Sequence, residues 1–196
     1  MSNTEVEELL HNGEKISGIT FDRDAIAFIS AVAYGSPYIA SLLGQHAGLA
    51  AVDRGVTQVE KVDVAEAINR SADEIRHRVS NFSLFQAAKA KADGHASNLG
   101  LLARLALHYG GRLMPEQADE VIRKPGQGLA YMQMMEKEYG LLEPMPDDPA
   151  GAYHFREEGV SVYLWIELAQ SHFAGSQGNA KMLDALLDQY AAAPGV

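Results

Sequence analysis

Apolar residues recur every three or four positions along most of the chain, which is the period of helices that bury one face. Ile26, Ile29 and Ala33 follow this spacing, and Leu99 and Leu102 follow it in the second half. We therefore predict a mainly α-helical fold.

Capping residues and glycines predict where the helices of the first half begin and end. Thr4 and Glu7 have the spacing of a capping box, and the short helix that they begin is expected to stop near Gly13. Asp63 and Glu66 have the same spacing at the start of a later helix. The helices predicted in this half cover about 4–13, 23–33, 37–54, 64–80 and 82–93, with a connector at 16–21 and a β-like connector at 56–62. The last two helices either break near Asn81 or form one continuous helix.

The second half predicts three helices followed by a β-hairpin. The helices cover about 96–109, 115–122 and 129–139, and the strands cover 141–145 and 153–156. Three helices followed by a hairpin is the order of elements in a winged helix. Two further helices are predicted at 160–173 and 182–190. We place a boundary at the Asp93-Gly94 turn, so the predicted subdomains are 1–93 and 94–196.

Composition narrows the function classes. A chain with 47% hydrophobic and 21% charged residues is typical of a globular protein, and the absence of cysteine excludes disulfides and thiolate metal sites. The net charge of −10 disfavours general affinity for nucleic acid or anionic lipid. The sequence has no apolar run long enough for a membrane span and no basic, apolar signal at its start, so we expect a cytoplasmic protein.

Motifs for independent catalysis are absent from the sequence. It contains no P-loop, no dinucleotide-binding G-x-G-x-x-G and no G-x-S-x-G elbow, so we do not expect this chain alone to be an enzyme. Two Glu-x-x-His spacings, Glu8 with His11 and Glu74 with His77, have the form used in di-iron bundles. The helix that carries the first pair is predicted to be too short for such a bundle, so no metal site is assigned.

The charge of the predicted winged helix is unfavourable for binding DNA. Residues 95–174 hold six basic and eleven acidic side chains, whereas a DNA-binding surface needs basic residues facing phosphates. Lys137 stands between Glu136 and Glu138. We therefore expect a protein partner ahead of DNA, with DNA kept as an alternative. The residues predicted to contact either partner are Arg123, Lys124, Gln127, Tyr131, Gln133 and Lys137.

One block of sequence resembles a known family. It runs from Ile19 to Ile68 and reads I-x-F, then A-x-G-S-P-Y from Ala33, L-L-x-x-H-A, and V-x-x-x-D-V-x-x-A-I. This block resembles the helical lid of AAA+ ATPases, especially the origin-recognition-like and the transposition or secretion ATPases of bacteria and archaea. A winged helix often follows such lids, and Tyr139–Arg156 fits the third helix and hairpin of one.

The resemblance implies that this chain is the carboxy-terminal, regulatory part of a larger ATPase. The nucleotide-binding core would precede Met1, and ATP or ADP with magnesium would bind the full-length protein, while this chain itself holds no cofactor. The residues implied to lie next to the nucleotide are Gly35, Ser36, Pro37 and Tyr38. No Lys or Arg occurs between Asp24 and Asp53, so a cationic sensor of the γ-phosphate is not expected.

Two other functions stay open at this point. One is a stand-alone winged-helix regulator that binds DNA. Its assembly into a dimer or another oligomer is left open. The other is a helical ligand-binding or metal-dependent protein, which a pocket with convergent polar groups would favour.

Overall fold

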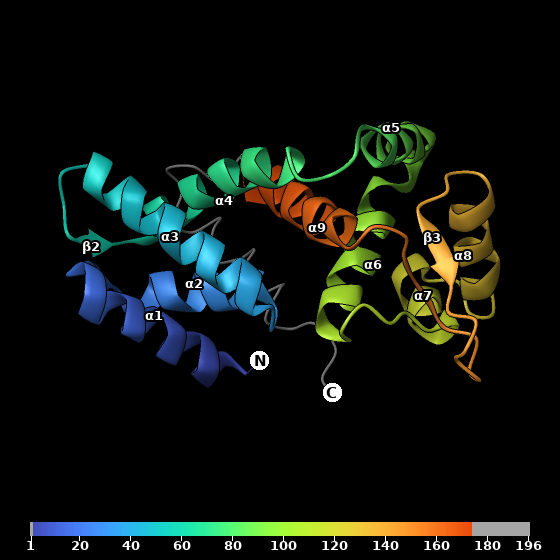
Figure 1. Ribbon diagram of the computed structural model, residues 1–196, viewed down its shortest axis with the longest axis horizontal. Helices are drawn as coiled ribbons and strands as arrows, with labels where there is room; N and C mark the ends of the chain where they lie inside the picture. Colours follow the sequence, from blue (N-terminus) through green and yellow to red (C-terminus); the bar gives the residue numbers. More distant parts are fainter. Residues whose placement is uncertain (1, 174–196) are drawn as a thin grey trace. The chain divides into compact units, whose positions relative to one another are not determined.

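The computed structural model describes residues 2–173, and the helix predicted at 182–190 lies outside this range. The fold is mainly helical, as the sequence predicts (Figure 1). The elements are α1 (Asn3–Ser17), β1 (Thr20–Phe21), α2 (Arg23–Ala33), α3 (Pro37–Asp53), β2 (Gln58–Val59), α4 (Lys61–Arg76), α5 (Asn81–Ala90), a π-helix (Lys91–His95), α6 (Ala96–His108), α7 (Pro115–Ile122), α8 (Gly128–Lys137), β3 (Leu142–Pro144), β4 (Tyr153–Phe155) and α9 (Glu158–Phe173).

The described chain forms two compact units. The first contains residues 2–73 and 169–173, and the second contains residues 74–168. The chain passes from one unit to the other within α4 and again within α9. This division places residues 74–93 in the second unit, whereas the sequence analysis placed them with the first half.

A two-stranded parallel pairing fixes the loops of the first unit. Thr20 pairs with Gln58 and Phe21 with Val59, so the segment before α2 is tied to the segment before α4. The Asp22 amide continues this ladder by donating to the Val59 carbonyl at 3.0 Å. The connector at 56–62 therefore contains a short strand, as its β-like sequence predicts, and the connector at 16–21 contains one that was not predicted. Together they hold the starts of α2 and α4.

The first helix is shifted and longer than predicted. Ser2, not Thr4, is the N-cap, and it forms the capping box with Glu5. The helix continues through Gly13 to Ser17 and ends at Gly18, whose φ of 72° is the left-handed conformation that glycine adopts without a steric penalty. Gly13 does not stop the helix because it keeps helical geometry there.

The start of α4 also differs from the prediction. The helix begins at Lys61, so Asp63 is its third residue and not its cap. The Asp63 carboxylate still serves the helix terminus, because it accepts a hydrogen bond from the Glu60 amide at 2.8 Å. Only 2% of Asp63 is exposed, and its main partner is the guanidinium of Arg54 at the end of α3.

In the second unit, α6, α7 and α8 are followed by an antiparallel hairpin, in the order predicted. Leu142 of β3 pairs with Phe155 of β4, and an isolated bridge joins Leu113, between α6 and α7, to Tyr153 of β4. Leu113 and Tyr153 exchange two backbone hydrogen bonds of 2.8 Å. A third short extended segment, which the sequence analysis did not predict, therefore lies beside the hairpin.

The turn predicted at Asp93-Gly94 is a kink in a continuous helical segment, and no loop separates α5 from α6 there. Gly94 has a φ of 91° inside the π-helix that joins α5 directly to α6. Ser80 caps α5 through the Ser83 amide, so α4 and α5 are separate helices and the chain does not continue as one helix past Asn81.

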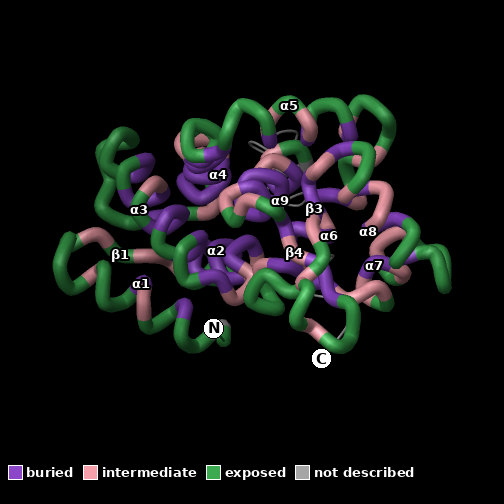
Figure 2. Tube along the Cα trace, turned by 45° about the vertical axis from the view of Figure 1, so that its right-hand side comes forward, coloured by how far each residue is buried: buried purple, intermediate pink, exposed green. Residues whose placement is uncertain are grey.

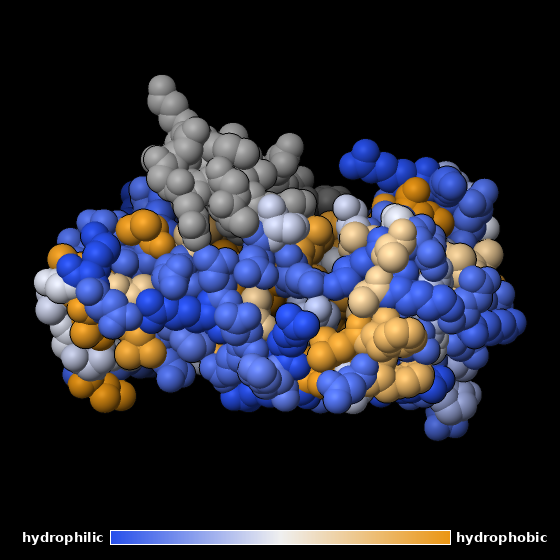
Figure 3. All heavy atoms as spheres, turned by 90° about the horizontal axis from the view of Figure 1, so that it is seen from above, coloured by the Kyte–Doolittle hydropathy of each residue, from blue (hydrophilic) through white to orange (hydrophobic). Residues whose placement is uncertain are grey.

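Each unit is organised around large buried side chains. Phe28, Ile29 and Leu43 are fully buried in the first unit, and Trp165 and Met132 are fully buried in the second. Residues 160–166 of α9 are buried without interruption (Figure 2). The face drawn in Figure 3 is mostly hydrophilic with small apolar patches between the polar residues. Within residues 2–173, no helix is long and apolar enough to cross a membrane.

Candidate functional site

The turn between α2 and α3 carries the residues predicted to lie next to a nucleotide. Tyr34 and Gly35 have φ values of 46° and 81°, so the chain reverses in two left-handed residues. This conformation costs a non-glycine residue such as Tyr34 about 1–2 kcal/mol. Ser36 then caps α3 by accepting the Ile39 amide at 3.3 Å, and Pro37 occupies the first helical position, as predicted.

Tyr38 is the side chain that this turn presents outward. It is 40% exposed, whereas the next two residues, Ile39 and Ala40, are fully buried. The Ser36 side chain is buried and engaged in capping. Of the four predicted residues, Tyr38 can therefore offer a ring to a ligand, while the other three shape the backbone. The positive end of the α3 dipole lies at the same place, and it favours anions.

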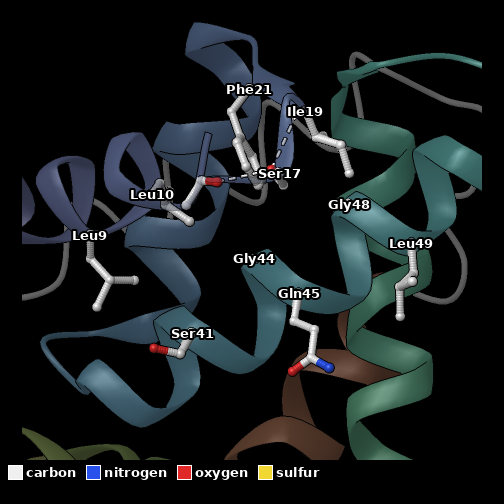
Figure 4. Close-up of a pocket in the computed structure, with 11 residues that line it drawn as sticks. Leu9, Leu10, Ser17, Ile19, Phe21, Ser41, Gly44, Gln45, Gly48 and Leu49 are labelled. Carbon is white, nitrogen blue, oxygen red and sulfur yellow. Dashed lines mark hydrogen bonds between the residues drawn. The ribbon is translucent and has the colours of Figure 1, made fainter. Parts of the chain in front are cut away.

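A groove of about 440 Å³ lies farther along α3, between this helix and α1 (Figure 4). Ser41, Gly44 and Gly48 form its floor, and Leu9 and Leu49 lie at its sides. A Cβ atom on Gly44 would lie 2.7 Å from Leu10 Cδ2, so the end of the Leu10 side chain occupies the space that a side chain at position 44 would take. None of the four predicted nucleotide-contacting residues lines this groove.

The six predicted partner residues do not form one surface. Gln133 and Lys137 lie on the outward face of α8, whose other members are the exposed Leu129 and Ala130 and the half-buried Met134. This face carries one charged side chain, Lys137.

The other predicted partner residues gather at the opposite end of α8. Lys124, Gln127 and Tyr131 line a pocket of about 370 Å³ between α6, α7 and α8. Arg123 ends α7 in the left-handed conformation, with a φ of 54°, and is exposed. Tyr131 is only 8% exposed, so it forms the pocket wall and does not reach outward as a base-reading residue would.

Aromatic contacts position Tyr131 in that pocket. The His95 ring stands edge-on to the rings of Tyr131 and Tyr139, with centroid distances of 5.6 and 5.8 Å. Tyr139 is held in turn by donating its hydroxyl hydrogen to Asp93 at 2.9 Å. Burial raises the pKa of the Tyr131 phenol, and the nearby Asn98 side chain lowers it by less. Tyr131 is therefore a neutral phenol throughout the physiological pH range.

An ion pair between residues far apart along the chain fixes the tip of the hairpin. The Arg112 guanidinium contacts both carboxylate oxygens of Asp148 at 2.5 and 3.0 Å. The same carboxylate accepts the Ala150 amide at 2.9 Å. The Arg112 hydrogen bonds are the largest cause of the lowered pKa of Asp148. The residues are 36 positions apart, so no helical spacing or local turn motif could have linked them.

The two Glu-x-x-His spacings do not meet in a metal-binding group. His11 pairs with Glu14 at 2.7 Å, and Glu74 pairs with Arg78. Among residues 2–173, the structure brings together no group of three His, Asp or Glu side chains that could hold a metal ion.

No protein-family model, curated protein or solved structure matches the chain.

Proposed function

We propose that this chain is the regulatory, carboxy-terminal part of an AAA+-type ATPase, a lid followed by a winged helix. A separate nucleotide-binding core would hold and hydrolyse ATP. The chain would change position with the state of the nucleotide and pass that change to a protein partner. It supplies no catalytic group in this scheme.

The observation that carries the proposal is the exposed ring of Tyr38 at the start of α3. The Tyr34-Gly35 turn and the Ser36-Pro37 cap fix the direction of this helix start. A base or ribose could pack against the Tyr38 ring, and phosphates would be favoured by the helix terminus. The parallel pairing of β1 with β2 supports a rigid body, since it ties the two loops at one end of this unit.

The composition of α8 supports a protein partner for the second unit. Its outward face combines Leu129 with a single cation, Lys137, and with Ala130 and Met134, which also border the pocket between α6, α7 and α8. DNA recognition helices need several basic or amide side chains directed at phosphates and base edges. An apolar face with few charges is typical of a contact between proteins.

The first test is the intact mass of the native polypeptide, isolated from source cells with antibodies against this chain. We expect a species about twice as heavy as the 21.2 kDa of this chain, since an AAA+ core adds a domain or more. Sequencing of that species should find a P-loop upstream of Met1. A native species near 21.2 kDa would overturn the proposal.

The second test asks whether Tyr38 contacts nucleotide in that full-length protein. Tyr38→Ala should weaken binding of a fluorescent ATP analogue about fivefold, a loss on the scale of one aromatic contact. Tyr109→Ala is the matched control, because Tyr109 is similarly exposed at 46% but lies in the second unit. Equal affinities for the wild type and both variants would exclude the nucleotide-facing role of Tyr38.

A DNA-binding measurement distinguishes the proposed function from the alternative of a stand-alone DNA-binding regulator. A DNA-binding regulator would bind duplex DNA with an affinity that falls steeply with salt concentration. For the proposed protein-facing unit we expect no sequence-specific duplex binding at 150 mM salt, even when the full-length protein is used.

A further inference from the structure

The pocket between α6, α7 and α8 has the features of a small-molecule site, and these features do not depend on the proposed function. It lies entirely within the second unit and has a volume of about 370 Å³, within the usual range for ligand pockets. Its apolar lining residues are Ile122, Ala130 and Met134, and Tyr131 adds an aromatic ring. Its polar lining residues are His95, Asn98, Lys124 and Gln127.

The charge of the pocket contrasts with that of the protein. The whole chain has a net charge of −10, yet no Asp or Glu lines this pocket. Lys124 is the one permanent cation among the lining residues, and no ion pair of Lys124 is found in the described part of the chain. The pocket is therefore suited to an anion.

The loop that carries Lys124 and Gln127 is held in place before any ligand binds. The Asp119 carboxylate accepts the amides of Gly126 and Gly128 at 2.9 and 2.5 Å. Gly128 packs directly on the start of α7, since a Cβ atom there would lie 1.9 Å from the Pro115 carbonyl oxygen. Both contacts fix the loop, so a ligand would not have to order it.

Tyr131 contributes an aromatic ring to the wall of this pocket. Its hydroxyl oxygen is shielded from solvent and therefore lies out of reach of a ligand in the pocket. Burial also raises the pKa of the phenol, so the ring stays neutral. The edge-on His95 ring keeps the Tyr131 ring in this position.

We propose that this pocket binds a small aromatic carboxylate. The ring would lie against Ala130, Tyr131 and Met134, and the carboxylate would pair with the ammonium group of Lys124. The amides of Asn98 and Gln127 can donate hydrogen bonds to the same anion. A neutral aromatic molecule would lose the contact with Lys124. A small aliphatic acid would lose the contacts with Ala130, Tyr131 and Met134.

The test is an NMR titration of the ¹⁵N-labelled full chain with three probes: benzoate, benzamide and acetate. Benzoate should bind with a dissociation constant on the order of 1 mM and shift the amides of 95–98 and 122–134. Benzamide, which lacks the charge, and acetate, which lacks the ring, should each bind at least about fivefold more weakly. Equal affinity for benzoate and benzamide, or shifts confined to other residues, would overturn the proposal.

Two variants and a control connect the binding to this pocket. Lys124→Gln should weaken benzoate binding about fivefold and leave benzamide binding unchanged, because only benzoate carries the charge. Ala130→Phe should block both probes, and it should fold because Ala130 is exposed. Lys137→Gln makes the same charge change on the outward face of α8 and should leave benzoate affinity unaltered. Unchanged benzoate binding in both pocket variants would refute the site.

Discussion

Gly100 of α6 and Leu168 of α9 lie so close that no side chain fits between them. A Cβ atom on Gly100 would lie 2.5 Å from Leu168 Cδ2 and 2.7 Å from Leu168 Cβ. Real Cβ atoms do not make such contacts, so α6 and α9 approach each other only because position 100 is glycine. The cation–π contact of Arg104 with Trp165, at 5.3 Å, joins the same two helices one turn farther along.

Gly100→Ala should therefore destabilise the second unit. The added methyl group forces Leu168 off its position or separates the two helices, and overpacking of this kind costs about 1–3 kcal/mol. This loss should exceed the gain of up to about 1 kcal/mol that alanine brings to a helix interior. Urea unfolding followed by circular dichroism measures the difference.

Gly159→Ala is the control for that experiment, because Gly159 lies in α9, the helix that Gly100 faces. Its Cβ would lie 3.6 Å from Val79 Cγ2, an ordinary van der Waals distance. The variant should be as stable as the wild type or more stable. If Gly100→Ala and Gly159→Ala had equal stability, the close approach of α6 and α9 would be wrong.

The pair of Asp63 and Arg54 predicts a second effect on stability. Two guanidinium nitrogens donate to the carboxylate at 2.9 and 2.8 Å, and the Glu60 amide donates at 2.8 Å, so every partner of Asp63 is a donor. Asp63→Asn would turn one acceptor into a donor that faces these groups. We expect it to lower the free energy of unfolding by about 2 kcal/mol.

Asp53→Asn is the matched control for Asp63→Asn. Asp53 also pairs with an arginine, Arg70, at 2.9 Å, but its side chain is 64% exposed. Exposed ion pairs add little to stability, so thermal unfolding of this variant should resemble that of the wild type. Equal losses in the two variants would show that burial of Asp63 contributes nothing.

Most helices could be predicted because their signals are local. The Ser36-Pro37 start of α3 and the Asp22 cap of α2 depend on residues within one turn. The predicted start of α1 was wrong because Ser2 and Glu5 have the same capping-box spacing as Thr4 and Glu7, and periodicity does not choose between the two registers.

The candidate sites were predictable only in part, because burial and long-range pairing are not local. Lys124, Gln127 and Tyr131 were proposed as an outward surface, but Tyr131 turns inward beside His95. His95 carried no signal, since the kink at Gly94 that directs it there depends on a π-helix. The Arg112–Asp148 pair spans 36 positions, so no local pattern in the sequence connects the two residues.

From the Arg112–Asp148 ion pair we predict how fast the backbone amides at the hairpin tip exchange with solvent. Asp148→Asn removes the charge that holds Arg112 and weakens the acceptor of the Ala150 amide. We expect faster amide hydrogen exchange in residues 145–152, while exchange in α6 and α8 stays the same. Asp147→Asn changes the same charge at the neighbouring position and serves as the control. Slow exchange in both variants would mean that the hairpin tip is held by other contacts.

Glu157 predicts how stability responds to acid. Its carboxylate accepts hydrogen bonds from the Ser80 hydroxyl, the Ser83 hydroxyl and the Ser80 amide, at 2.7, 2.7 and 2.9 Å. Partial burial raises the pKa of Glu157, but these three hydrogen bonds outweigh burial, and the pKa lies below its ordinary value of 4.5. The folded state therefore binds this proton less readily than the unfolded state does.

Because the folded-state pKa is lowered, the stabilisation from Glu157 is fully present above pH 4.5 and is lost as the pH falls through the folded value. Glu157→Gln should lower the free energy of unfolding at pH 7 by about 1 kcal/mol and reduce its further fall between pH 5 and pH 3, ranges set by ordinary carboxyl titration. Glu158→Gln, an exposed neighbour, controls for net charge. The urea concentration at the midpoint of unfolding, measured for each variant from pH 7 to pH 3, tests this prediction. An acid response in Glu157→Gln as steep as in the wild type would contradict the role of this carboxylate in holding the start of α5.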